Sequence, residues 1–412
     1  MEKEVLITDD AVVLGLLVSC LGLIFYTSQL KSLKNFYKII PALLLCYLIP
    51  SLFSTAGIIS PKVSGLWPVA KNYFLPASLI LMTLSTDLKG VIKLGPKALI
   101  MFFTATIGII LGGPAAILIT SLFSPETVGG LEFDAVWRGM ATLAGSWIGG
   151  GANQTAMLEL YQFNPEKYGA MITVDIVVAN IWMAFILYGA GKSDKIDKWL
   201  KADSSTIDDL KNKMENYSSA VERNTTFHDL MKISTIALGG VGIAHFLGSI
   251  LSKCNKYFPI FNDTVFTSHF FWVVVVSTTL GLVFSFTRLR SLEGAGASKI
   301  GSVFIYLLVA IIGMKMDITK AVEQPLLIVV GLIWMIFHVG LLFIVAKIIR
   351  APFFFLAVGS KANVGGAASA PIVASAFHPS LAPVGVLLAV LGYALGTYGA
   401  ILCATLMEIA SH

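Results

Sequence analysis

Long apolar segments separated by short polar ones run along nearly the whole chain. An α-helix needs about 20 apolar residues to cross the hydrocarbon core of a membrane. Segments of about this length lie at 11–27, 37–54, 68–86, 98–123, 136–160, 168–190, 229–252, 270–286, 295–314, 325–346, 352–378 and 382–408. None is a continuous alternation of apolar and polar positions of the kind that builds outer-membrane barrels. The pattern therefore predicts an all-α polytopic membrane protein.

The composition supports the same class. Of the 412 residues, 56% are hydrophobic and 13% are charged, whereas soluble proteins carry about 25% charged residues. The mean hydropathy of +0.81 excludes a water-facing surface and also a disordered chain. The net charge of +5 comes from Lys and Arg scattered between the apolar segments. We therefore expect the lipid bilayer, and no nucleic acid, as a partner.

The N-terminal segment and the cysteines do not indicate a catalytic or binding site. The acidic start MEKEVLITDD lacks the basic region of a signal peptide, so we expect the first helix to remain in the mature protein. The four cysteines show neither a CxxC pair nor a metal-binding spacing, which assigns them to packing. They are Cys20, Cys46, Cys254 and Cys403.

The chain reads as two related halves, residues 1–190 and 229–412, joined by a polar linker at 191–228. The third segments end in LILMTLSTDLKGV and LLVAIIGMKMDITKAV, and the fifth segments contain GSWIGGGANQTA and GSKANVGGAASAP. The shared order and the shared glycine clusters predict an internal duplication.

The fifth segments, 136–160 and 352–378, have glycine and polar residues at their middles, where a crossing helix is most apolar. If each enters the membrane and turns back, each half has five transmembrane helices and one re-entrant hairpin, and the second half is inverted. With the N-terminus outside, this arrangement puts more of the 29 Lys and Arg on the cytoplasmic side than a crossing by every segment would. We expect two inverted repeats in the bacterial cytoplasmic (inner) membrane, a cytoplasmic linker and both termini outside. Broken helices that cross the membrane remain the alternative to hairpins.

The two glycine clusters are the candidate substrate site. Non-helical backbone inside a membrane costs several kcal/mol per unpaired group unless protein, water or a ligand satisfies it. Close helix packing is the alternative reason for small residues, but paired glycine interruptions in two halves favour a transporter site. The candidates are Ser146, Gly149, Gly150, Gly151, Asn153, Gln154 and Thr155 in the first cluster, and Ser360, Asn363, Gly365, Gly366 and Ser369 in the second.

Asp175, in MITVDIVVANIW, is the strongest single candidate for a functional residue, because a carboxylate at membrane depth is usually functional. We expect it to bind the coupling cation with help from Asn180, although five residues of helix need not leave both on one face. A structural ion pair with Lys361 is the alternative. Lys361 itself has three interpretations: contact with an anionic substrate, pairing with Asp175, or a position facing the cytoplasm. The matching stretch of the last segment has no acid and offers Tyr393, Thr397 and Tyr398.

At the two glycine motifs, the sequence resembles the membrane family called domain of unknown function 819. That family belongs to the superfamily of cation–proton antiporters and anion transporters, which includes sodium–glutamate, sodium–citrate and bile-acid–sodium symporters. The resemblance implies a glycine-rich re-entrant loop in each half, at Gly149–Gly151 and Gly365–Gly366. It also implies an acidic residue after a broken helix, at Asp175. The second motif, NVGGAASAP, departs from the pattern of the symporters, so their substrates do not transfer.

No Walker loop, HExxH, GxSxG or paired Cys/His set is present, so we expect no enzyme and no cofactor. The sequence predicts a secondary transporter of a small organic anion (an amino acid, a carboxylate or a small peptide) coupled to Na⁺ or H⁺. No metal is expected beyond Na⁺ at Asp175. A core would move against a scaffold, which would also offer a homodimer interface. A cation–proton antiporter, a channel and a non-transporting membrane scaffold or enzyme subunit are the alternatives.

Overall fold

The computed structural model describes residues 5–40, 42–60, 64–202, 207, 210, 224–255, 267–315, 325–378 and 381–411. Every regular element in these ranges is helical, as the apolar pattern predicts. Seven of the described helices are long and apolar enough to cross a membrane, or eight if the bent pair α14 (His269–Ser285) and η6 (Arg288–Ala295) counts as one span. The seven are α1 (Asp10–Ser28), α7 (Pro96–Ser121), α10 (Tyr168–Ala190), α13 (Phe227–Asn255), α15 (Ala297–Lys315), α16 (Leu326–Ile348) and α19 (Ala382–Ala410).

The third predicted segment, 68–86, is not one regular helix. It consists of α4 (Leu66–Val69), a π-helical turn η2 (Ala70–Phe74) and α5 (Leu75–Leu84). Pro76 explains the irregularity, because proline has no N–H to give to the carbonyl of Asn72. That carbonyl is instead 2.9 Å from Nε2 of His245 on α13. His245 is thus a packed, hydrogen-bonded histidine that compensates for a proline.

The predicted linker begins with a short helix, α11 (Ser193–Leu200). The Asp197 carboxylate accepts a hydrogen bond of 2.7 Å from the Phe353 N–H, which docks α11 onto the start of α17 (Phe353–Asn363). Partial burial raises the pKa of the Asp197 carboxyl. Residues 203–206, 208–209 and 211–223 of the predicted linker lie outside the described residues.

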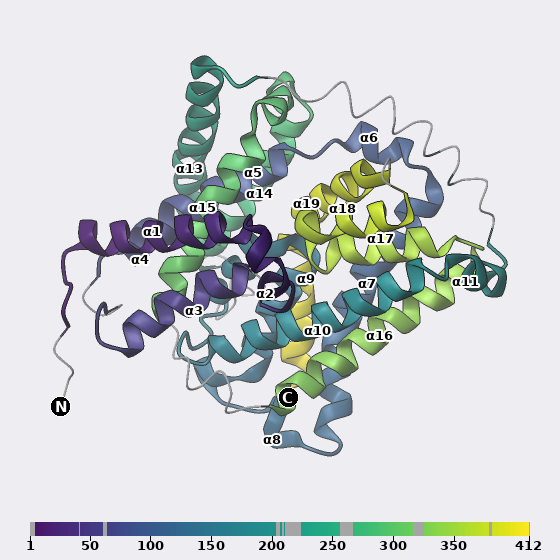
Figure 1. Ribbon diagram of the computed structural model, residues 1–412. Helices are drawn as coiled ribbons and strands as arrows, with labels where there is room; N and C mark the ends of the chain where they lie inside the picture. The colour runs from purple at the N-terminus through teal and green to yellow at the C-terminus, as the bar shows by residue number, and fades with distance from the viewer. Residues whose placement is uncertain are drawn as a thin grey trace.

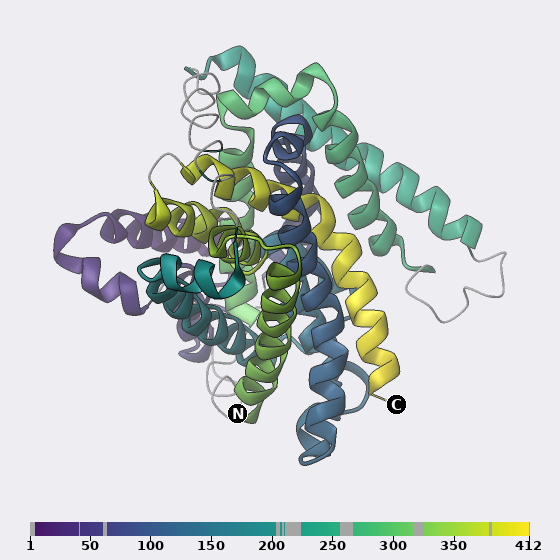
Figure 2. The ribbon, with the colours of Figure 1, turned by 90° about the vertical axis from the view of Figure 1, so that its right-hand side faces the viewer.

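The long helices form two bundles that lie side by side (Figure 1). Bundle A contains α1, α3 (Ala42–Thr55), α5, α13, α14 and α15. Bundle B contains α7, α9 (Val136–Leu160), α10, α16, α17, α18 (Gly366–Phe377) and α19. Each bundle takes helices from both halves of the chain. Figure 2 shows α7 and α19 running side by side within bundle B.

The two bundles meet along α5 and α14 of bundle A and α9 and α19 of bundle B. Hydroxyl groups bridge them. Thr278 Oγ1 is 2.9 Å from Thr397 Oγ1, and Thr279 Oγ1 is 2.7 Å from the Tyr398 hydroxyl. At one end, Lys71 of η2 forms an ion pair of 2.9 Å with Glu159 of α9. The boundary is therefore polar in places, whereas the side chains buried inside each bundle are mainly apolar.

Candidate functional site: two glycine turns beside α10 and α19

Helix α9 folds back on itself at Gly150, whose φ of 73° and ψ of −171° are not helical. The rings of Trp137 and Tyr161 are 5.4 Å apart, whereas a straight helix would separate these residues by about 36 Å. A Cβ added at Gly145 would lie 2.6 Å from the carbonyl oxygen of Asn153. The two arms of α9 therefore pack against each other, and we call the segment Gly149–Gly151 turn 1.

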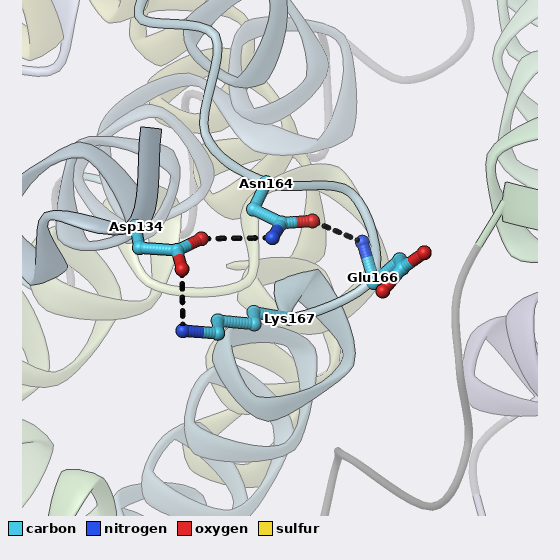
Figure 3. A network of polar contacts seen from close by, with 4 residues as sticks. All are labelled: Asp134, Asn164, Glu166 and Lys167. Atoms are coloured by element: carbon cyan, nitrogen blue, oxygen red, sulfur yellow. Dashed lines mark hydrogen bonds and ion pairs between the residues drawn. The ribbon is translucent and has the colours of Figure 1, made fainter. Parts of the chain in front are cut away.

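A polar cluster ties together the two chain ends of α9 (Figure 3). Asp134 precedes the helix and accepts hydrogen bonds of 2.8 Å from both Asn164 Nδ2 and Lys167 Nζ, which follow it. Asn164 also accepts a hydrogen bond of 3.0 Å from the Glu166 N–H. The chain thus enters and leaves α9 at the same place.

Helices α17 and α18 repeat this arrangement in the second half. They are separated by Val364 and Gly365, and both Gly365 (φ 113°) and Gly366 (φ 55°) have positive φ. The ring of Phe377 at the end of α18 is 5.9 Å from that of Phe353 at the start of α17. The chain therefore returns along its own path, and we call the segment Val364–Gly366 turn 2.

One asparagine side chain fixes each turn. Asn153 Nδ2 donates to the Gly149 carbonyl at 2.8 Å, and its Oδ1 accepts from Thr397 of α19 at 2.6 Å. Asn363 Nδ2 donates to the Gly359 carbonyl at 3.0 Å, and its Oδ1 accepts from Thr106 of α7 at 2.9 Å. Both asparagines are buried. Each amide thus hydrogen-bonds to a backbone carbonyl four residues earlier in the chain and to a hydroxyl group of another helix.

Asp175 of α10 faces turn 1 and is partly exposed. Its carboxylate accepts hydrogen bonds from Ser146 Oγ at 2.6 Å, Trp147 Nε1 at 2.7 Å and Gln154 Nε2 at 3.1 Å. Ser146 and Trp147 precede Gly150 in the chain, whereas Gln154 follows it, so the carboxylate holds both arms of α9.

Two phenol groups also lie near this carboxylate. The phenol groups of Tyr47 and Tyr168 both interact electrostatically with Asp175, and their rings lie 6.3 Å apart. Tyr47 belongs to α3 of bundle A, whereas Asp175 and Tyr168 belong to bundle B. Carboxylate, hydroxyl and amide oxygens at the boundary of the bundles are donor atoms that suit a hard cation such as Na⁺.

Lys361 lies beside turn 2 and is only 2% exposed. Its ammonium group donates to the Ala179 carbonyl at the long distance of 3.4 Å and interacts electrostatically with Asp175. The Ser369 hydroxyl, close to Gly365, is buried without a hydrogen-bond partner. An ammonium ion has three N–H donors, so turn 2 retains hydrogen-bond donors that none of the described residues uses.

Helix α19 passes between the two turns. A Cβ added at Gly392 would lie 2.7 Å from the Ile148 carbonyl oxygen and 3.4 Å from that of Ala362, which belong to the segments before turn 1 and turn 2. The ring of Tyr393 would lie 3.3 Å from a Cβ at Gly150, and its hydroxyl bonds to the backbone of Ala367, just after turn 2. Glycine at position 392 thus permits the close approach that brings both turns together.

Some candidates lie away from this centre. Asn180 is exposed and donates to the Ile176 carbonyl of its own helix at 2.8 Å, so it does not join Asp175. Thr155 donates to the Gly151 carbonyl at 3.0 Å. Ser360 accepts from Trp182 Nε1 at 2.8 Å and bonds to His338 Nε2 at 2.8 Å, so it connects α17 to α10 and α16.

The sequence did not indicate that Trp147 donates a hydrogen bond to Asp175 or that Tyr47 and Tyr168 lie near that carboxylate. It also did not indicate that Gly392 lies against the segments before both turns. Trp147 stands inside the motif GSWIGGG, and that position was the available signal. Tyr47 lies in an apolar segment without a polar motif, whereas Gly392 directly precedes Tyr393 in a stretch that the sequence did single out.

A helical chain with this many apolar spans is an integral membrane protein. The family described as "Protein of unknown function (DUF819)" matches residues 15–409, and the chain belongs to that family. It is 23% identical over 354 residues to the "Uncharacterized membrane protein YjcL" of Bacillus subtilis (strain 168). The similarity covers 84% of each chain.

Proposed function

We propose that this protein is a secondary transporter, not an enzyme, that carries a small organic anion together with Na⁺ or H⁺. The observation that carries the proposal is the meeting of turn 1 and turn 2, from opposite halves of the chain, beside Asp175 and Lys361. Paired, glycine-interrupted segments of this kind are the strongest sequence pointer to a transporter site.

The two turns bind ligand groups of opposite charge. The coupling cation binds at the Asp175 carboxylate, which lies beside both arms of α9 and near two phenol oxygens. The anionic group of the substrate binds at turn 2, where Lys361 and Ser369 hold unused donors. An amino acid, a carboxylate or a small peptide would meet this requirement.

Alternating access follows from motion of bundle B, the core, against bundle A, the scaffold. Three facts support this division: both turns belong to bundle B, each bundle draws on both halves, and hydroxyl contacts and one ion pair bridge the boundary. Bundle A would also supply the surface for a homodimer. The two halves are inverted repeats, turn 1 and turn 2 are re-entrant hairpins, and the family belongs to the cation–proton antiporter and anion transporter superfamily.

The same proposal sets the orientation, with the linker 191–228 in the cytoplasm and both termini outside the bacterial inner membrane. An impermeant thiol reagent added to intact cells should label cysteines introduced near Pro125 and leave cysteines in the linker unlabelled. Labelling of the linker from outside would contradict this orientation.

Flux into proteoliposomes tests the function. The purified protein should accumulate one radiolabelled amino acid, carboxylate or small peptide above equilibrium under an imposed Na⁺ or H⁺ gradient, and should not do so without the gradient. Uptake that only equilibrates in every condition would indicate a channel. Cation–proton exchange without any organic substrate would indicate an antiporter, and no flux at all would favour a membrane scaffold.

A further inference from the structure

An apolar groove runs along the outside of bundle B between α10 and α16. It has a cavity volume of ≈ 640 Å³ and is lined mainly by Ile181, Trp182 and Phe185 of α10 and by Met335, Val339 and Phe343 of α16. These side chains leave no row of polar groups that could pair with the backbone of a peptide. The groove therefore suits a hydrocarbon chain.

The length of the groove matches one leaflet of a bilayer. The lining positions on α10 run from Val178 to Gly189, which is about 16 Å of helix, and half of a membrane's hydrocarbon core is about 15 Å. The lining positions on α16 run from Leu332 to Phe343, and the ring of Phe343 lies 6.1 Å from that of Trp199 on α11. Both helices therefore end at the same mouth of the groove, where α11 lies (Figure 1).

Basic side chains surround this mouth. Lys192 Nζ lies 4.2 Å above the ring of Tyr188, and Lys347 Nζ lies 3.9 Å above the ring of Trp199. Among the described residues, the ion pairs do not include either lysine. Positive charge is in excess here. Further cations on and near α11 are Lys195, Lys198, Lys201 and Arg350, whereas the acidic residues on α11 are Asp194 and Asp197. Asp197 is already engaged by the Phe353 N–H.

We infer that this groove binds an anionic phospholipid, with an acyl chain between α10 and α16 and the phosphate beside Lys192 and Lys347. Basic pockets at the cytoplasmic ends of transmembrane helices attract anionic headgroups. A zwitterionic lipid would bring its own cation against the excess of lysines. A free phosphate would make no use of the apolar walls.

The bound lipid would also lie against a residue that contacts the core of bundle B. Trp182 forms part of the groove wall, and its indole N–H donates to Ser360, the neighbour of Lys361. The lipid site does not depend on the proposed transport, and it is tested by binding alone.

The test is thermal unfolding of the purified full-length protein in detergent, titrated with phosphatidylglycerol, phosphatidylcholine or glycerol phosphate. Phosphatidylglycerol should raise the melting temperature at the lowest concentration, and glycerol phosphate should have no effect. In Lys192→Gln/Lys347→Gln, the concentration for half-maximal stabilisation should rise about tenfold. Lys31→Gln/Lys34→Gln, which removes two exposed lysines far from the groove, is the charge-matched control.

A second variant blocks the acyl chain. Gly340 lines the groove, and a Cβ added there meets no atom within 4 Å, so Gly340→Leu can start a side chain at the groove wall. This variant should lose the stabilisation by phosphatidylglycerol. Gly239→Leu is the control, because Gly239 of α13 is equally open and lies in the other bundle.

Equal stabilisation by phosphatidylcholine would overturn the inference, because the groove would then bind lipid without regard to charge. An undiminished response in both groove variants would do the same. Stabilisation by glycerol phosphate equal to that by phosphatidylglycerol would show an anion site without an acyl chain. If Gly340→Leu does not fold, the lysine pair and its control still decide the outcome.

Discussion

Turn 1 and turn 2 fold the chain back over the same span, yet turn 1 is arranged around a carboxylate and turn 2 around an ammonium group. In each, the aromatic rings that meet at the base belong to residues 24 positions apart, Trp137 with Tyr161 and Phe353 with Phe377. At turn 1, the carboxylate of Asp175 is surrounded by donors. At turn 2, Lys361 has one long hydrogen bond and Ser369 has none.

The two turns share a backbone bend that glycine permits, and they differ in the charge of the side chains nearby. Glycine bends the backbone in both places, and near each bend an asparagine amide donates to the backbone carbonyl four residues earlier. The charged residues beside the two turns differ, and under the proposed function they would determine which ligand charge each turn accepts. Two similar glycine turns with oppositely charged neighbours would allow one site to hold a cation and an anion together.

The largest effect should come from separating Asp175 and Lys361. Asp175→Asn leaves a buried ammonium ion without its counter-charge and should lower the free energy of unfolding by about 3 to 5 kcal/mol. Asp175→Asn/Lys361→Met should recover most of that loss. The measurement is thermal unfolding, together with uptake as a function of Na⁺ and pH.

The uptake data then distinguish coupling from structure. If Asp175 binds the coupling ion, the double variant is stable but its uptake no longer depends on the ion gradient. Wild-type ion dependence in the double variant would instead make Asp175 a structural partner of Lys361.

The next largest effect should come from the glycine of turn 1. Gly150 has backbone angles that are almost restricted to glycine, so Gly150→Ala should cost about 1 to 3 kcal/mol and abolish uptake. Gly366→Ala at turn 2 should cost about 1 kcal/mol, because its left-handed helical φ of 55° is less restrictive and a Cβ meets no atom within 4 Å. Thermal unfolding and uptake measure both.

Gly151→Ala is the matched control for this pair, because the new Cβ would lie at an ordinary 3.5 Å from Ile305. It should change stability little. A loss in Gly151→Ala as large as that in Gly150→Ala would show that the cluster needs small side chains and not the special backbone angles.

A smaller effect should come from the asparagine contacts. Thr397→Val removes the donor to Asn153, and Thr106→Val removes the donor to Asn363. Each should lower the free energy of unfolding by about 1 to 2 kcal/mol, since a buried amide oxygen loses its partner. Thr235→Val is the control in the same thermal unfolding assay, because the exposed Thr235 hydroxyl donates to the Met231 carbonyl of its own helix, α13. Equal melting temperatures in all three variants would contradict a structural role for these contacts.

The smallest effect on stability should come from the ion pair between the bundles. Lys71→Gln breaks a partly exposed pair with Glu159 and should cost less than about 1 kcal/mol. If bundle B moves against bundle A, the maximal uptake rate should nevertheless change, because this pair must separate during the motion. Lys167→Gln breaks a pair with Asp134 that lies outside the bundle boundary, and it should leave the rate unchanged. Equal rates in both variants would count against motion at this boundary.

Apolar length and glycine clusters were enough to predict many of the helices and two of the places where the backbone bends. Apolar length predicted α10 at Tyr168–Ala190 and α19 within two residues of its ends. Glycine clusters predicted the interruptions at Gly150 and Gly365, because a non-helical backbone with positive φ in a membrane calls for glycine at that position. The sequence missed the irregularity before Pro76, where a π-turn replaces regular helix.

Which side chains contact each other depends on the tertiary structure, because the contacts join helices that are far apart in the sequence. Asp175 contacts Trp147 and Gln154, whereas Asn180, five residues further along α10, faces away. Gly392, more than 200 residues from Ile148, lies against its carbonyl. Helical periodicity fixes the face on which a residue lies, but the neighbour of that face depends on how helices distant in sequence pack. Since apolar faces of similar composition pack in many ways, only the assembled bundle selects the partners.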